Sequence, residues 1–285
     1  MTISLVDDGS TDDTSTCVAA YQDPRVLYLP LKRNVGKSAA VNLAVRSAQG
    51  EWLMFVDSDD RCVSNRLALQ LNFVGSIHAV DATFARAVFV DENQRRTDAC
   101  FPSKNHDIGG QIELRELLRY CPVGGGSLFV RRSAFLQIGG FDAELRKAED
   151  LDFAIRFAQK FALAGQNDIV IENRISADGM MQNPAPESLL RLIERHDALF
   201  LRHAPHRLAY LCREAGDEFE QIGQSATAVG LFWRALWLKP NRTNRERLVT
   251  ATLNRWYSPW AVRLAARALK FLNFRDARAG GRSDR

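Results

Sequence analysis

Two short apolar runs near the start of the chain each end abruptly in a cluster of aspartates. Residues 3–6 and 52–56 are followed by Asp7, Asp8, Gly9 and Ser10, and by Asp57, Ser58, Asp59 and Asp60, respectively. A short, fully apolar run is typical of a strand that is covered on both faces. In an open α/β sheet, ligands bind outside the carboxyl ends of the strands. The two clusters are therefore predicted to converge on one ligand crevice.

The segments that follow alternate between strand and helix patterns. Further strand-like runs lie at residues 26–29, 82–90, 127–130 and 169–171, and helical spacing of apolar residues occurs at 38–48 and 149–161. The polar stretch 91–107 is predicted to be a loop. Strands that alternate with helices predict an α/β fold with a mostly parallel sheet flanked by helices.

The composition changes around residues 183–187, where Pro184 and Pro186 interrupt the chain. Almost every later segment has a helical pattern, at residues 188–201, 208–223 and 225–238. We therefore expect an α/β domain at residues 1–183 and an all-helical region at 184–285. The helical region is weakly tetratricopeptide-like in its spacing of small residues, but one unit is too few for a repeat array. The aromatic residues of this region are predicted to be core residues: Phe232, Trp233 and Trp237.

The end of the chain is basic. From Arg255 onward, eight basic residues accompany two acidic ones, and residues 260–274 have the pattern of a basic amphipathic helix. Such a helix is suited to an anionic membrane surface, where a lipid-linked acceptor would lie. Equally, its apolar face could pack on the rest of the protein. Both interpretations stay open.

The overall composition excludes several classes of protein. Lys and Arg number 38 against 34 Asp and Glu, and a net charge of +4 does not favour a nucleic-acid binder. The five cysteines form no C-x-x-C pair, so we expect no disulfide framework and no zinc site. No apolar run is long enough for a transmembrane helix, and no signal-peptide pattern is present. These features predict a cytoplasmic protein, peripheral on the inner face of the membrane if residues 260–274 bind lipid.

A third acidic cluster, at Glu149, Asp150 and Asp152, precedes a helical pattern. Crowded carboxylates repel one another unless a cation or protons neutralise them. Carboxylate ligands suit Mg²⁺ or Mn²⁺, which proteins hold with one or two acids plus substrate phosphates. A third acid could accept a proton from an attacking hydroxyl. Helix capping, a solvated strand end and a favourable helix dipole are the structural alternatives for the three clusters.

Taken in order, these motifs resemble the inverting glycosyltransferases of family 2, which have the GT-A fold. The matching segments are Val6–Thr14, Asn34-x-Gly36 with Asn42, Asp57–Asp60, Gly126–Arg132, Gly139–Asp142 and Glu149–Asp152. The resemblance covers about residues 2–180. It implies a GT-A sheet flanked by helices and a nucleotide-sugar donor, with UDP-sugars the commonest in the family.

The resemblance also implies roles for individual residues. Asp7 or Asp8 would bind the nucleotide base, and Lys37 is a weaker candidate for a nucleotide contact. Asp59 would bind the metal ion, and Asp57, the other acid of the D-x-D motif, would lie nearer the ribose.

The acceptor side of the reaction is implied in the same way. Asp150, with Glu149 in reserve, would be the general base that deprotonates a hydroxyl of a surface glycan or a lipid-linked acceptor. A single in-line displacement then inverts the anomeric carbon. Thr252–Trp256 lacks the glutamine of the Q-x-x-R-W motif of polymer-extruding synthases, so we expect a single addition.

The sequence departs from the family pattern in two other places. Met1 stands directly before the Asp-Asp-Gly-Ser strand, where family members have a further strand and helix, so we expect an amino-terminally shortened domain. No histidine occurs in residues 173–178, so either Asp178 or water would complete the metal coordination, or metal dependence would be weaker than is usual in the family. A shortened crevice leaves a non-catalytic binding remnant as the alternative. A D-x-D phosphotransferase is less favoured, because Asp60 stands where such enzymes need a small or β-branched residue.

Overall fold

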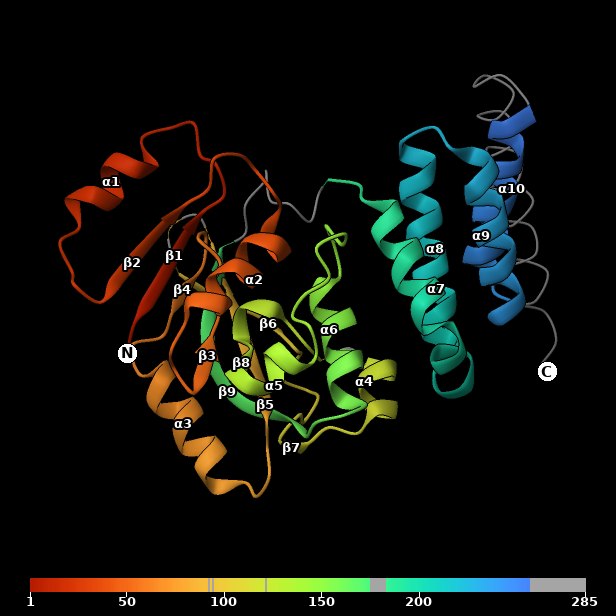
Figure 1. Cartoon of the computed structure of the whole chain (residues 1–285). Coiled ribbons are helices and arrows are strands. Elements are labelled where there is room, and N and C mark those ends of the chain that lie inside the picture. Colours follow the sequence, from red (N-terminus) through yellow and green to blue (C-terminus); the bar gives the residue numbers. More distant parts are fainter. Residues whose placement is uncertain (92, 94, 121, 175–182, 257–285) are drawn as a thin grey trace. The chain divides into compact units, whose positions relative to one another are not determined.

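The computed structural model describes residues 1–256 except 92, 94, 121 and 175–182 (Figure 1). The chain divides into two compact units, Met1–Asn183 and Pro184–Arg285. In the first unit, strands and helices alternate, and the described part of the second unit is helical. No helix in the described ranges combines the length and the apolar character that a membrane crossing requires.

The first acidic cluster follows a small parallel sheet. Strand β1 (Ile3–Asp7) pairs with β2 (Val26–Pro30), and helix α1 (Thr14–Ala20) lies between them in the chain. The Leu31 amide donates to the Asp7 carbonyl at 2.8 Å, which continues the pairing one residue further. Helix α2 (Lys37–Ser47) follows and packs against β1. The chain therefore passes from the end of β2, beside the end of β1, through a short loop into α2.

The larger sheet has the strand order β3-β8-β5-β9-β4, with β6 added to β5 and β7 added to β9 (Figure 1). Its strands are β3 (Trp52–Met54), β4 (Arg61–Cys62), β5 (Ala82–Val90), β6 (Arg96–Phe101), β7 (Gly110–Gln111), β8 (Phe129–Arg131) and β9 (Leu163–Arg174). Strand β5 is almost entirely buried, which explains why its apolar pattern is so clear in the sequence.

The α/β fold class is confirmed, but the prediction of a mostly parallel sheet is wrong. Within the described residues, β1–β2 and β5–β9 are parallel, whereas the other five pairings are antiparallel. Strands β3, β5 and β9 do run in one direction, but β8 runs against them between β3 and β5. An apolar run indicates burial and carries no information on direction, and β8 is only three residues long.

The polar stretch 91–107 contains a strand that the sequence analysis interpreted as a loop. Strand β6 lies within it and pairs only with β5, so one of its edges and much of its surface face solvent. Polar residues are compatible with an exposed edge strand, where charged side chains also discourage pairing with other chains. The hydropathy pattern of β6 therefore resembles that of a loop.

The other helices of the first unit are α3 (Arg66–Ser76), α4 (Leu114–Tyr120), α5 (Arg132–Gln137) and α6 (Glu149–Ala158), with a 3₁₀ turn η1 (Gly125–Ser127) before β8. Aromatic side chains pack α5 against α6. The ring of Phe153 on α6 lies 5.1 Å from the rings of both Phe135 and Phe141, measured between centroids. Phe153 and Phe135 are almost completely buried. This packing fixes α6, whose first residues carry the third acidic cluster.

The second unit contains α7 (Pro186–His203), α8 (Pro205–Gln221), α9 (Ser225–Leu238) and α10 (Arg242–Trp256), each packed on the next. A Cβ placed at Gly216 would lie 2.6 Å from the ring of Phe232, so this glycine allows α8 and α9 to approach closely. Phe232 is buried, but Trp233 and Trp237 are 60% and 78% exposed, so the prediction that all three belong to the core is wrong for the tryptophans. Residues 260–274 lie outside the described part of the chain.

Candidate functional site

Asp7, at the end of β1, holds the two strands of the small sheet together. Its carboxylate accepts a hydrogen bond from the Ser10 amide at 2.7 Å and another from the hydroxyl of Tyr28 on β2. Hydrogen bonds from Ser10 and Tyr28 lower the pKa of Asp7 below its ordinary value. Only 7% of Asp7 is exposed. Asp7 is therefore buried and ionised, and each of its carboxylate oxygens accepts a hydrogen bond from the protein.

Asp8 shapes the loop that leads into α2. Its two carboxylate oxygens accept hydrogen bonds from the amides of Val35 and Gly36, at 2.7 and 2.8 Å. Gly9 has a φ of +78°, and a Cβ there would lie 2.7 Å from the backbone of Arg33. The first cluster therefore packs tightly against the loop. The capping alternative is not borne out at α1, because its N-cap residue, Asp13, makes no side-chain capping hydrogen bond.

Lys37, the first residue of α2, joins the second acidic cluster to the third. Its ammonium nitrogen lies 2.9 Å from Asp57 Oδ2 and 3.4 Å from Glu149 Oε1. Burial lowers the pKa of Lys37, but the carboxylates of Asp57 and Glu149 raise it more, so the net pKa lies above the ordinary value. The ammonium is therefore the positive charge that allows these carboxylates to lie close together.

The second cluster forms a turn, closed by a 3.1 Å hydrogen bond from the Asp60 amide to the Asp57 carbonyl. Asp60 Oδ2 accepts from the side-chain amide of Asn173, at the end of β9, at 2.7 Å. Burial, followed by the charge of Asp57, raises the pKa of Asp60 to about 6. Asp59 is exposed and has no hydrogen bond or ion pair to any described residue. Its carboxylate is therefore free to bind a ligand.

The metal-binding prediction depends on these two aspartates. No group of three or more His, Cys, Asp or Glu side chains in the described ranges is arranged to hold a metal ion. Asp59 offers one carboxylate, and Asp57 would offer a second if its ion pair with Lys37 were broken. One or two carboxylates are what Mg²⁺ takes from a protein when substrate phosphates provide further ligands. The donor set therefore fits a metal ion that arrives with a diphosphate. Asp178 lies outside the described residues.

Asp150 sits at the start of α6, against the glycine-rich turn η1. Its Oδ2 accepts from the Gly125 amide at 3.1 Å, and its Oδ1 accepts from the Leu151 amide at 2.7 Å. Loss of hydration, followed by the charge of Glu149, raises the pKa of Asp150 to about 6. A Cβ at Gly125 would lie 3.6 Å from the Cβ of Asp150, so the turn and the helix are in close contact. This carboxyl group titrates near neutral pH.

The remaining motif residues position α2 and α6. Asn42 on α2 donates to the Phe141 carbonyl at 2.7 Å and accepts from the Phe141 amide at 3.0 Å. Arg156 on α6 pairs with the buried Asp152 at 2.8 Å and also donates to the carbonyls of Ile138 and Gly140. These bonds hold α2 and α6 to the same segment, residues 138–141, which lies between α5 and α6 in the chain. Asn42 lies within the matching motifs, but neither this role nor the contact of Asn173 with Asp60 could be predicted from the sequence.

The three acidic clusters are thus connected through a continuous set of contacts. Asp8 binds the Gly36 amide, the next residue, Lys37, contacts Asp57 and Glu149, and the neighbouring Asp150 contacts Gly125. These contacts bring residues of the three clusters together, whereas the shared ligand crevice stays a prediction. These oppositely charged groups are partly buried, and the pKa values of Lys37, Asp60 and Asp150 are raised. Such an arrangement is typical of a functional site.

Residues 1–139 match the family model described as glycosyl transferase family 2. Among curated proteins, the chain is 24% identical over 204 residues to an uncharacterized glycosyltransferase of Rickettsia typhi, covering 70% of this chain and 60% of that relative. The next two relatives, also from Rickettsia, are covered over 55% and 28% of their lengths. The chain therefore spans less than two thirds of these relatives.

Solved structures with a similar fold include S. aureus TarS and a mannosyltransferase. The S. aureus TarS fragment 1–349 has a TM-score of 0.58 at 19% identity, covering 89% of this chain and 75% of that chain, and a second structure of it contains UDP-GlcNAc. The mannosyltransferase PcManGT of Pyrobaculum calidifontis, solved with GDP-Man and Mn²⁺, has a TM-score of 0.50 at 20% identity, covering 94% of this chain and 74% of that chain. At this identity, the similarity shows the fold.

Proposed function

Because residues 1–139 match the family model of glycosyl transferase family 2, we propose that the protein transfers a sugar from a nucleotide diphosphate donor to an acceptor hydroxyl, with inversion at the anomeric carbon. The observation that carries this proposal is the position of Lys37 between Asp57 and Glu149. It places the D-x-D turn and the Glu-Asp pair on either side of one cation.

The donor side of the proposal rests on the first two clusters. The backbone loop held by Asp8 and the side chain of Lys37 border the space where the nucleotide binds, and Asp59 offers its free carboxylate to the metal ion. Bound Mg²⁺ or Mn²⁺ would stabilise the negative charge that develops on the departing diphosphate. UDP-GlcNAc and GDP-Man in the similar structures support a nucleotide-sugar donor, and we propose a UDP-sugar.

The acceptor side rests on Asp150. With a pKa of about 6, its carboxyl group is mostly ionised at pH 7 and can still accept a proton. In the proposed reaction, Asp150 takes the proton of the acceptor hydroxyl as the oxygen attacks the anomeric carbon and the bond to the diphosphate breaks. Glu149, held by Lys37, keeps a second negative charge beside the base and so favours proton uptake.

The acceptor is proposed to be a surface glycan or a lipid-linked glycan that receives one sugar. The basic pattern of residues 260–274 supports peripheral contact with the inner face of a membrane, which would bring the enzyme to a lipid-linked acceptor. Vesicle sedimentation of the chain with and without the residues after Pro259 tests this contact, and equal pelleting of the two forms would remove it.

Isothermal titration calorimetry and a donor-hydrolysis assay together test the function. The wild type should bind a UDP-sugar in the presence of Mn²⁺ and hydrolyse it slowly. Asp59→Asn should weaken donor binding, whereas Asp150→Asn should leave the donor Kd unchanged and abolish transfer. Asp98→Asn, on the exposed strand β6, is the matched control and should behave like the wild type. Donor binding without hydrolysis or transfer would instead support a binding remnant, and no nucleotide-sugar binding would refute the proposal.

A further inference from the structure

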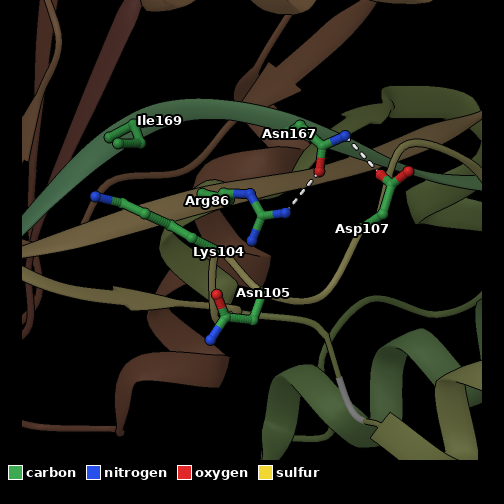
Figure 2. A pocket seen from close by; sticks show the side chains of 6 residues that line it. All are labelled: Arg86, Lys104, Asn105, Asp107, Asn167 and Ile169. Atoms are coloured by element: carbon green, nitrogen blue, oxygen red, sulfur yellow. Dashed lines mark hydrogen bonds between the residues drawn. The ribbon is translucent and has the colours of Figure 1, made fainter.

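A second polar pocket lies between β5, β9 and the loop that connects β6 to β7 (Figure 2). Its volume is about 450 Å³, and its lining residues are Arg86, Lys104, Asn105, Asp107, Asn167 and Ile169. This volume is within the range of small-molecule sites. None of these residues belongs to the three acidic clusters, so the proposed function leaves this pocket unexplained.

Arg86 gives the pocket a buried positive charge. The residue is 5% exposed, although it lies in the middle of strand β5. Its Nη1 donates to the carbonyls of Pro102 and Ser103, at 2.8 and 2.6 Å, and its Nη2 donates to the His106 carbonyl and to Asn167 Oδ1, both at 2.6 Å. All four acceptors are uncharged. A buried charge is normally paired with an opposite one, so this guanidinium leaves positive potential that its hydrogen-bond partners do not neutralise.

Lys104 and Asp107 determine the net charge of the pocket. Lys104 is exposed and makes no hydrogen bond or ion pair with any described residue. Asp107 Oδ1 accepts from the Asn167 side chain at 2.7 Å and from the Gly109 amide at 2.9 Å. Figure 2 shows Asn167 between Arg86 and Asp107, bonded to both. The lining therefore contains two cations and one carboxylate and has a net charge of +1.

An irregularity in the sheet brings Asn167 into this position. The β5–β9 pairing passes from Ala85 opposite Gln166 to Arg86 opposite Ile169, so Asn167 and Asp168 are skipped. Bulges of this kind occur preferentially next to functional sites, where they redirect a side chain. The bulge costs ladder hydrogen bonds in the middle of the sheet, and its visible result is the arrangement of Arg86, Asn167 and Asp107.

A series of contacts leads from Arg86 in the pocket to Asp150 in the candidate site. Pro102, which accepts from Arg86, follows Phe101, and the Phe101 ring lies 3.6 Å from the position of a Cβ at Gly124. Gly125, the next residue, donates to Asp150. The pocket is thus linked to the proposed base, whereas the loop held by Asp8 lies at the donor side.

We propose that this pocket binds an oxyanion carried by the acceptor, such as a phosphate or a carboxylate group. The exposed ammonium of Lys104 would contact the oxyanion, and the buried guanidinium of Arg86 would attract it from a fixed position. The side-chain amide of Asn105 would donate a further hydrogen bond. The assignment to the acceptor rests on the proposed function, whereas oxyanion binding itself does not. Asp107 limits the affinity, because it places a negative charge beside the ligand.

Calorimetric titration of the full chain with inorganic phosphate tests the binding step. Lys104→Gln should weaken phosphate binding about fivefold, and Asp107→Asn should strengthen it by a similar factor, as expected for single charges near the surface. Lys160→Gln, on an exposed lysine outside the pocket, is the matched control and should have no effect. Opposite effects of the two pocket variants support an electrostatic site. An unchanged phosphate Kd in both variants, or equal weakening by the control, would overturn the proposal.

The same titration with saturating UDP and Mn²⁺ separates this site from the donor site. Phosphate binding that persists supports a separate pocket, and phosphate binding that UDP abolishes contradicts it. In transfer assays, Lys104→Gln should raise the KM for a phosphorylated acceptor several-fold without changing kcat or the KM of the same acceptor lacking phosphate. Equal KM changes for both acceptors would refute the acceptor assignment. If the phosphate Kd responds as expected but no nucleotide sugar binds, the proposed function fails and the oxyanion site stands.

Discussion

Replacing Lys37 by glutamine removes the cation that Asp57 and Glu149 share. The nitrogen-to-oxygen distances of 2.9 and 3.4 Å correspond to a gross attraction of about 5 kcal/mol for each pair at an effective dielectric constant of about 20. One third of the Lys37 side chain is exposed, so solvent screening and the cost of desolvation cancel most of this attraction. We expect the free energy of unfolding to fall by about 1–2 kcal/mol, as measured by urea denaturation.

The same substitution should have the opposite effect on metal binding. Without the ammonium, Asp57 and Glu149 are repelling carboxylates with no other ion-pair partner among the described residues, and a divalent cation relieves that repulsion. Lys37→Gln should therefore bind Mn²⁺ alone about tenfold more tightly than the wild type in calorimetry, which corresponds to about 1.4 kcal/mol. Lys37→Arg keeps the charge and is the control. Unchanged Mn²⁺ affinity together with unchanged stability in Lys37→Gln would show that the bridging role is wrong.

Three further substitutions test other parts of the site. Asp150 must be ionised to act as a base, so the rate of transfer should fall as the pH drops through about 6. Asp150→Asn should lower kcat by about 10² to 10⁴-fold. A pH-independent rate between pH 5 and 7 would contradict this role. Gly9→Ala should destabilise the protein by about 2–4 kcal/mol in urea, because a Cβ would collide with the backbone of Arg33. Asn42→Ala removes both bonds to Phe141 and should lower the free energy of unfolding by about 2–3 kcal/mol in urea. Wild-type stability of this variant would show that these bonds do not hold α2 to the segment that precedes α6.

Burial of Asp150 also predicts a pH dependence of stability. Its pKa is raised from 3.8 in the unfolded chain to about 6 in the folded one, so between these pH values the folded state binds more protons. The contribution of this residue therefore makes the protein less stable as the pH rises from about 4 to 6, by at most about 3 kcal/mol. Asp150→Asn should lack this contribution, so the difference in unfolding free energy between the wild type and the variant should change with pH by this amount. An identical slope in both proteins would refute it.

The sequence predicts most reliably those features that depend on local patterns. The buried strand at residues 82–90 and the aspartates at strand ends appear directly in the order of apolar and polar residues. Strand β6 was missed because an exposed edge strand has no apolar pattern, and the reversed strand β8 because direction is set by tertiary pairing. Trp233 and Trp237 show the converse error, since apolar side chains on a helix can remain exposed.

The contacts that build the candidate site are less accessible to sequence reasoning. Residue types in the acidic clusters indicate metal and proton chemistry, but Lys37 bridges partners 20 and 112 positions away in the chain. The contact of Asp60 with Asn173 spans 113 positions. The bonds of Arg86 also depend on the bulge in β9. Such distant pairings follow from the assembled sheet and leave no signal in a single sequence.

The position of Lys37 also has a kinetic consequence. Gly36, whose amide is held by Asp8, is separated from the acid at the head of α6 by a single lysine side chain. A donor complex that draws the ammonium away from Glu149 leaves that carboxylate's charge uncompensated beside Asp150, and proton affinity there increases. Filling of the donor site and readiness of the base are thereby coupled through one movable charge.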